Sequence, residues 1–182
     1  MSYLAPALLA RHHELDAFSC RSDEQTEWLI RHARQSMAAG TTRVFVVTGA
    51  QSRKVVAYYA WTMARIEQAD APARLLKGSG RYPQPVALLA RLGVDTRHEG
   101  PGLGAGLLQD VIYRAAAISE QTGCRGLLVH AESGQAREFC RHLVPEFESS
   151  PSDELHLLLL LKDIRRTLRG PDTAPPQAQS RK

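Results

Sequence analysis

The pattern of apolar and polar positions is most informative between residues 86 and 131, where it predicts one strand–helix–strand unit. Val86 to Val94 is an apolar run of strand length, and a polar turn then leads to a glycine-rich corner at Gly100 to Gly104. Apolar side chains next recur at helical spacing over residues 102–122, at Leu103, Leu107, Leu108, Val111, Ile112, Ala115 and Ile118. Arg125 to Ala131 is a short apolar segment, typical of a parallel strand buried on both faces.

The flanking segments predict a mixed sheet around this unit. Thr42 to Thr48 and Lys54 to Arg65 are rich in β-branched and aromatic residues, and the turn between them makes them an antiparallel pair. Leu155 to Lys162 is predicted to be the last strand. The fold class is therefore α/β (α+β), with antiparallel N-terminal strands joined to a βαβ unit.

Helix signals complete the predicted order of elements. Ser22 and Gln25 form a capping box, which predicts a helix that ends at Gly40. Further helices are expected at residues 12–18 and 133–143. We expect one domain over residues 1–162, followed by a frayed helix start and a basic, disordered tail over residues 163–182.

The glycine corner carries the clearest chemical signal. A strand, a glycine turn and a helix start present free backbone N–H groups at the positive end of the helix dipole, which suits a phosphate or pyrophosphate. A P-loop is excluded, because no Gly-Lys-Ser/Thr follows the glycines. A dinucleotide fingerprint fits poorly, since the acidic residue that it requires about 20 positions later is not placed at a strand end.

Composition narrows the class of protein. The 182 residues are 43% hydrophobic, which is ordinary for a globular protein, and the net charge of +4 permits a nucleic-acid partner. Cys20, Cys124 and Cys140 have no metal-ligand spacing, so we expect no metal and a reducing cytoplasm. We also expect no membrane association, because no apolar run approaches 18 residues, and no export signal is recognised at the N-terminus.

Several spaced motifs resemble one family. The stretch Glu99-Gly100-Pro101-Gly102-Leu103-Gly104, aligned on a Leu-Leu pair, resembles the acetyl-CoA loop of GNAT-type N-acetyltransferases. ARLGVD at residues 90–95, HEGPGLG at the corner, RGLLVHA at residues 125–131 and AREF at residues 136–139 resemble the acetyltransferase toxins of toxin–antitoxin modules, the TacT, AtaT and KacT kind. The resemblance covers residues 5–162 and implies the GNAT fold.

The resemblance also implies a mechanism and a set of site residues. Acetyl-CoA would place its pyrophosphate on the corner, formed by Glu99, Gly100, Pro101, Gly102, Leu103 and Gly104, and its pantetheine arm along Leu92, Gly93 and Val94. A backbone N–H of Leu92 or Val94 would stabilise the oxyanion while the amino group of an aminoacyl-tRNA attacks the thioester, which would block translation. The family further implies a homodimer, a ribbon-helix-helix antitoxin and a basic tRNA surface, here Lys77, Arg81 and Arg91.

Two residues depart from the family pattern. Glu99 stands where the family has Gln or Arg, which puts a negative charge beside the expected pyrophosphate; Arg97 would offset it, or Glu99 would turn to solvent. Cys140 stands where the family has the tyrosine expected to act as general acid, and its sulfur ends several ångström short of a phenol oxygen. We therefore expect weakened catalysis.

Two alternative functions stay open at this point. One is an N-acetyltransferase that acts on a protein or small-molecule amine. The other is an acetyl-CoA-binding module with little catalysis, which Cys140 favours. His130, at the end of a predicted strand, is read either as a general base or as a packed histidine.

Overall fold

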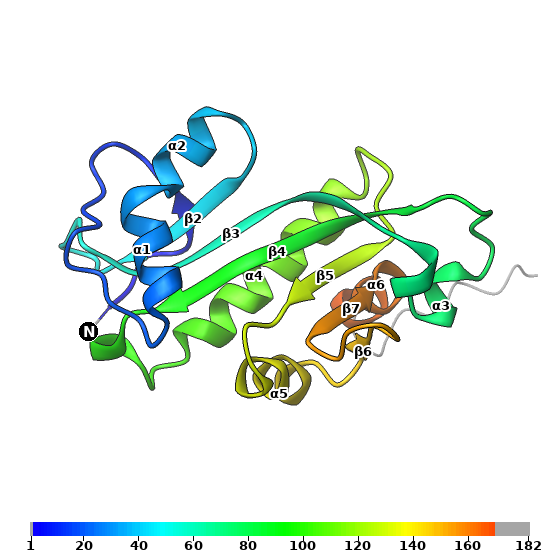
Figure 1. The fold of residues 1–182 in the computed structure, drawn as a ribbon. Helices are drawn as coiled ribbons and strands as arrows, with labels where there is room; N and C mark the ends of the chain where they lie inside the picture. Colours follow the sequence, from blue (N-terminus) through cyan, green and yellow to red (C-terminus); the bar gives the residue numbers. More distant parts are fainter. Residues whose placement is uncertain (1, 170–182) are drawn as a thin grey trace, which may run out of the picture.

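The computed structural model describes residues 2–169, and its strands form one seven-stranded sheet (Figure 1). In chain order the strands are β1 Ala7–Leu8, β2 Arg43–Thr48, β3 Val55–Ile66, β4 Gln84–Val94, β5 Gly126–His130, β6 Glu148–Ser149 and β7 His156–Leu160. Their order in the sheet is β1-β2-β3-β4-β5-β7-β6, and only β4 and β5 are parallel neighbours. The predicted mixed sheet with its βαβ unit is therefore confirmed.

Helices cover both faces of this sheet. They are α1 Asp23–Arg31, α2 Ala33–Ala38, α3 Ala73–Leu76, α4 Leu103–Ile118, α5 Gly134–Leu143 and α6 Leu161–Arg169. On one face, α4, α5 and α6 bury side chains such as Leu108 against β3, β4 and β5. On the other face, α1 and α2 pack on the β2–β3 half, and α3 packs through Leu75 on the β4–β5–β7 half. Burial of these apolar faces is what holds the layers together.

The two long strands β3 and β4 pair along most of their length, with one irregularity in the ladder. Tyr59 points to the α4 side and Tyr58 to the α1 side, and both side chains are fully buried. The β3–β4 register shifts between Ala60 and Trp61, where Ala90 is the extra residue of a bulge. Because the bulge lies in the middle of β4, it separates a segment paired to β5 from a segment that runs on to the glycine corner.

The N-terminal region differs from the prediction in two places. Ser22 caps α1 as predicted, since it accepts a hydrogen bond from the Gln25 amide (3.2 Å), but the helix breaks at His32 into α1 and α2 before it reaches Gly40. The predicted helix at residues 12–18 is wrong. Glu14 exchanges backbone hydrogen bonds with Arg53 (2.8 Å) and Val55 (3.0 Å), which hold this segment extended beside β3.

The C-terminal helix is packed rather than frayed. In α6, Ile164 is buried in the core under α4, and the buried Asp163 pairs with Arg74 of α3 (3.0 Å). The packed body thus continues beyond residue 162, where we expected it to end. Residues 170–182 of the expected tail lie outside the described residues. None of the described helices has the length and apolar character needed to cross a membrane.

Candidate active site

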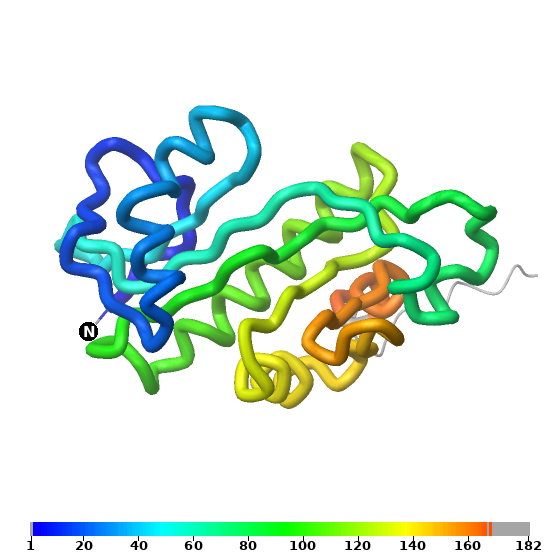
Figure 2. Tube along the Cα trace, viewed as in Figure 1, coloured from blue at the N-terminus to red at the C-terminus, as the bar shows by residue number. Residues whose placement is uncertain are grey.

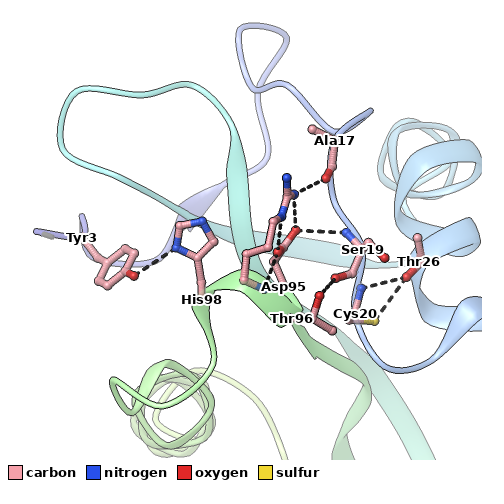
Figure 3. A network of polar contacts seen from close by, with 9 residues as sticks. Tyr3, Ala17, Ser19, Cys20, Thr26, Asp95, Thr96 and His98 are labelled. Atoms are coloured by element: carbon pink, nitrogen blue, oxygen red, sulfur yellow. Dashed lines mark hydrogen bonds and ion pairs between the residues drawn. The ribbon is translucent and has the colours of Figure 1, made fainter.

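The turn after β4 is fixed by one buried carboxylate (Figure 3). Asp95 accepts hydrogen bonds from the Ser19 amide (3.0 Å), from the Arg97 amide (3.0 Å) and from the Arg97 guanidinium (2.7 and 2.9 Å). Arg97 also donates to the Ala17 carbonyl. The hydrogen bonds from the Arg97 side chain lower the pKa of Asp95 to about 2, so the carboxylate stays charged. Asp95 therefore ties the end of β4 to residues 17–19.

Beyond this turn, the corner has the backbone geometry of an anion site. Gly100 (φ 103°) and Gly102 (φ 86°) are in the left-handed region that favours glycine, and a Cβ on either would meet no described atom within 4 Å. The first hydrogen bond of α4 runs from the Gly106 amide to the Gly102 carbonyl (2.9 Å), and no side chain caps the helix. The amides of residues 103–105 therefore have no partner within the helix and suit a pyrophosphate.

Gly104 has a different reason to be glycine. A Cβ there would lie 3.2 Å from the Phe139 ring and 3.7 Å from the Val94 side chain. The missing side chain lets α5 lie against the first turn of α4. Leu103 is partly buried on the core beside it, whereas Pro101 is exposed. Within the predicted pyrophosphate loop, Gly104 and Leu103 thus also serve packing.

The end of β4 offers main-chain groups to a ligand. β4 pairs with β5 only from Ala87 to Leu89, and the two strands then diverge (Figure 2). The Asp95 amide donates to the Val56 carbonyl of β3 (2.8 Å). Because N–H and C=O groups alternate sides along a strand, those of Leu92 and Val94 point away from β3, toward the side from which β5 has departed. This arrangement fits a pantetheine arm and an oxyanion donor.

Between these two residues, Gly93 meets a steric requirement. A Cβ on Gly93 would lie 2.9 Å from the Tyr58 ring and 3.4 Å from both Cys20 and Phe18. The glycine allows the N-terminal segment to pack tightly over β4. The predicted ligand-binding stretch Leu92–Val94 is thus held rigidly from one side.

The negative charge of Glu99 is paired with a residue that the sequence did not indicate. Arg97, the expected partner, is engaged by Asp95. Glu99 instead accepts hydrogen bonds from Nε and Nη2 of Arg21, at 2.6 to 3.1 Å. Arg21 precedes α1 and is 78 residues away in the chain. No local sequence pattern connects the two residues.

Cys140 lies in the core, 6% exposed, on the buried face of α5. Burial raises the pKa of its thiol to about 11. A buried thiol with a raised pKa is poorly suited to deliver a proton to a thiolate in the gap between β4 and β5. The structure thus gives a second reason, beyond side-chain length, to expect weak general acid catalysis.

The three residues assigned to the basic surface are not together. Arg91 is in the carboxyl-terminal half of β4, where it pairs with Glu24 of α1 (3.0 Å) and lies over the Trp28 ring (4.9 Å). Lys77 and Arg81 are exposed in the loop before β4, at the opposite end of that strand (Figure 1). The structure therefore divides the predicted surface into two parts.

The end of β5 brings further polar groups toward α1. His130 stacks on His156 of β7 with ring centroids 3.9 Å apart, and burial followed by the charge of His156 lowers the pKa of His130. Glu132 accepts hydrogen bonds from the Ser22 hydroxyl and from Gln25 Nε2 (3.1 Å). Glu132, which no sequence motif marks as a site residue, links the β5 side of the gap to the start of α1. Among the described residues no group of three His, Cys, Asp or Glu side chains could hold a metal ion.

Comparisons with solved structures place this fold among known proteins. A mutant of KacT superimposes with a TM-score of 0.82, at 20% identity over 91% of this chain and 98% of that one. AtaT in complex with acetyl-methionyl-tRNAfMet superimposes with a TM-score of 0.81, at 22% identity over 90% and 98%. At these identities the likeness shows the fold, which is the GNAT fold that the motifs predicted.

Sequence comparison shows the family. No family model matches the chain. A "tRNA-acetylating toxin" of Mycobacterium tuberculosis is 37% identical over 163 residues, which are 90% of this chain and 95% of the relative. A "Probable toxin TacT" of Sinorhizobium fredii is 28% identical over 159 residues, 84% of this chain and 88% of the relative. The chain therefore belongs to the family of tRNA-acetylating toxins, N-acetyltransferases of the GNAT type.

Proposed function

We propose that this protein transfers an acetyl group from acetyl-CoA to the α-amino group of an aminoacyl-tRNA and thereby blocks translation. The observation that carries the proposal is the pair of main-chain sites at the end of β4: the free amides at the start of α4, and the N–H groups of Leu92 and Val94 in the gap between β4 and β5. The first suits the pyrophosphate of acetyl-CoA and the second suits its pantetheine arm. The name of the Mycobacterium tuberculosis relative supports tRNA as the acceptor.

In the proposed reaction, the neutral amine attacks the thioester carbonyl. The N–C bond forms as negative charge develops on the carbonyl oxygen, and the N–H of Leu92 or Val94 donates a hydrogen bond to that oxygen. The C–S bond then breaks, and the amine proton is lost to solvent as coenzyme A leaves as a thiolate. Cys140 would protonate this thiolate poorly because it is buried with a raised pKa, so we expect turnover to be slow.

The assembly that we propose follows the related toxins. Structures exist of AtaT bound to the C-terminus of the antitoxin AtaR and of a KacTA–DNA complex. By analogy we propose that this chain is a cytoplasmic homodimer neutralised by a ribbon-helix-helix antitoxin. Lys77, Arg81 and Arg91 would contact the tRNA, Arg91 near the aminoacyl end and the other two farther along the molecule.

The deciding experiment is transfer of labelled acetyl from acetyl-CoA to a pool of charged tRNAs. Label on the aminoacyl end, absent with deacylated tRNA, would support the proposal. Label on protein or small-molecule amines but not on tRNA would indicate the alternative acceptor. Measurable acetyl-CoA binding without transfer to any amine would indicate a binding module with little catalysis.

A further inference from the structure

The pyrophosphate corner contains a charge that should oppose its ligand. Glu99 immediately precedes Gly100 in the sequence. An unpaired carboxylate at this position would repel a bound diphosphate. In the structure this carboxylate is held by both Nε and Nη2 of Arg21, at 2.9 and 2.6 Å. This is a two-point contact between planar groups, the geometry in which a guanidinium binds most specifically.

Arg21 keeps donors available while it is held. A guanidinium has five N–H groups, and the contacts with Glu99 use the one on Nε and one on Nη2. Both N–H groups of Nη1 and the second of Nη2 make no hydrogen bond to any described residue. The Arg21 side chain is 76% exposed, so its remaining N–H groups are accessible from solvent.

The backbone on either side of Arg21 is fixed. The Cys20 amide donates to the Thr26 hydroxyl (3.0 Å), and the Ser22 hydroxyl caps α1 while it also donates to Glu132. Arg21 therefore projects from a braced segment rather than from a free loop. Its position beside Gly100 depends on that segment and on Glu99.

We propose that Arg21 is the cationic pyrophosphate-binding side chain of this protein, and that Glu99 is its anchor. The inference rests on the proposed acetyl-CoA site. Together the two residues replace the single Gln or Arg that the acetyl-CoA loop has in the resembling family. Glu99 supplies no contact to the ligand; it holds the Arg21 fork at the corner, and Arg21 donates to a phosphate oxygen with the N–H groups that Glu99 leaves free.

The proposed role of Glu99 predicts the opposite change in acetyl-CoA affinity from the one expected if Glu99 acted only through its negative charge. If Glu99 only repelled the diphosphate, Glu99→Ala would tighten acetyl-CoA binding. If Glu99 anchors Arg21, the same substitution weakens binding, because Arg21 then loses its fixed orientation. We expect about a three-fold loss for Glu99→Ala and about a ten-fold loss for Arg21→Ala, as for one charge-assisted hydrogen bond.

The test is calorimetric titration of acetyl-CoA into the full chain and its variants. The double variant Glu99→Arg with Arg21→Ala should regain affinity, since the cation then projects from the loop itself. A matched control is the exposed pair Glu27–Arg31 (2.8 Å) on α1, whose alanine variants should leave the affinity unchanged. S-acetylpantetheine, which lacks the diphosphate, should bind all variants equally. If Arg21 only maintained the structure of the site, its substitution would weaken the binding of S-acetylpantetheine as well.

Tighter or unchanged binding by Glu99→Ala, or unchanged binding by Arg21→Ala, would overturn the inference while the wild-type chain still binds acetyl-CoA. Failure of the wild-type chain to bind acetyl-CoA at all would instead overturn the proposed function, and this inference with it. The two failures are therefore distinguishable in one titration series.

Discussion

The two ends of β4 differ in the groups that they present to a ligand: main-chain N–H groups at the carboxyl end and exposed cationic side chains at the amino end. At the carboxyl end, the buried Asp95 fixes the turn, Gly104 packs against Phe139 at the start of α4, and the exposed corner between them presents main-chain N–H groups. At the amino end, Lys77 and Arg81 project into solvent from a loop, next to Tyr82, which is 81% exposed. The eleven residues of β4 are joined by ten steps, so the ends lie about 33 Å apart at 3.3 Å per step.

In the proposed function, the carboxyl end carries out the chemistry and the amino end attracts the tRNA, and the difference between the two ends supports this division. A site made of main-chain groups keeps its geometry, so it suits a reaction that needs fixed distances. Exposed cations contribute long-range, salt-dependent attraction instead. An acceptor that reaches both ends must be at least about 33 Å long by the strand spacing, which a tRNA satisfies and a free amino acid does not.

The largest effect should come from breaking the carboxyl end at Asp95. Asp95→Asn removes the charge that Arg97 and the Ser19 amide contact, so we expect the free energy of unfolding to fall by about 2–3 kcal/mol in urea titrations. Asp153→Asn, at an exposed carboxylate 3.5 Å from His156, is the control. A loss of less than about 0.5 kcal/mol for Asp95→Asn would contradict this account of the turn.

Asp95 should also make the stability of the protein depend on pH in the acid range. The pKa of Asp95 is lowered in the folded state from 3.8 to about 2, so its contribution to stability is complete above pH 3.8 and is lost as the pH falls through 2. The free energy of unfolding, measured as the pH is lowered from 3.8 to about 2, should fall in the wild-type protein. The fall should be smaller in Asp95→Asn. Equal declines would show that other carboxylates dominate acid unfolding.

The next effect concerns the reaction at this end. Cys140→Tyr should raise the rate of acetyl transfer to charged tRNA by about ten-fold or more, because a phenol oxygen reaches farther than the buried thiol, which is a poor general acid. Cys140→Phe is the matched control, since it adds the ring without the hydroxyl. Equal rates for the two variants would assign any gain to packing rather than to proton transfer.

At the amino end, we expect effects on binding but not on folding. Replacing both Lys77 and Arg81 with alanine should raise KM for charged tRNA several-fold, reduce its salt dependence and change stability by less than about 0.5 kcal/mol. Arg74→Ala is the contrasting variant: it should destabilise the fold, because Arg74 pairs with the buried Asp163. Unchanged tRNA kinetics in the double variant would remove this loop from the substrate surface.

The smallest effect concerns the stacked histidines between the ends. His156→Asn should raise the pKa of His130 toward its ordinary value, because one of the causes that lower it is the neighbouring imidazole. In the wild-type protein, folding favours the neutral form of His130, because its pKa is lower in the folded state than in the unfolded state. The folded protein is therefore most stable, with respect to this residue, above pH 6.5, and it loses stability as the pH falls from 6.5 through the lowered pKa. An NMR titration of the ring protons measures the shift, and an unchanged pKa would contradict it.

The sequence predicted the parts of the fold that local patterns determine. The run from Val86 through the glycine corner to α4 and β5 has strong periodicity, and Ser22 and Ser133 each lie at a helix start with suitable caps. The packing of α6 was also readable in principle, because Leu161, Ile164 and Leu168 are spaced along one face of the helix.

What the sequence could not reveal is which charges pair across the chain. Arg97 is two residues from Glu99 but binds Asp95, while Glu99 pairs with Arg21, and Glu132 pairs with residues more than 100 positions away. Such choices depend on the three-dimensional meeting of α1, β4 and β5. The burial of Cys140 likewise follows from how α5 rotates against the core, which the residue types in α5 do not specify.

The divergence of β4 from β5 has a consequence for how such proteins evolve. The groups that Leu92 and Val94 present to the gap belong to the main chain, so every amino acid except proline can supply them. Substitution can therefore accumulate along this edge without erasing the site, provided that the bulge at Ala90 and the shape of the gap persist. This tolerance is consistent with structures that superimpose closely although only about one residue in five is identical.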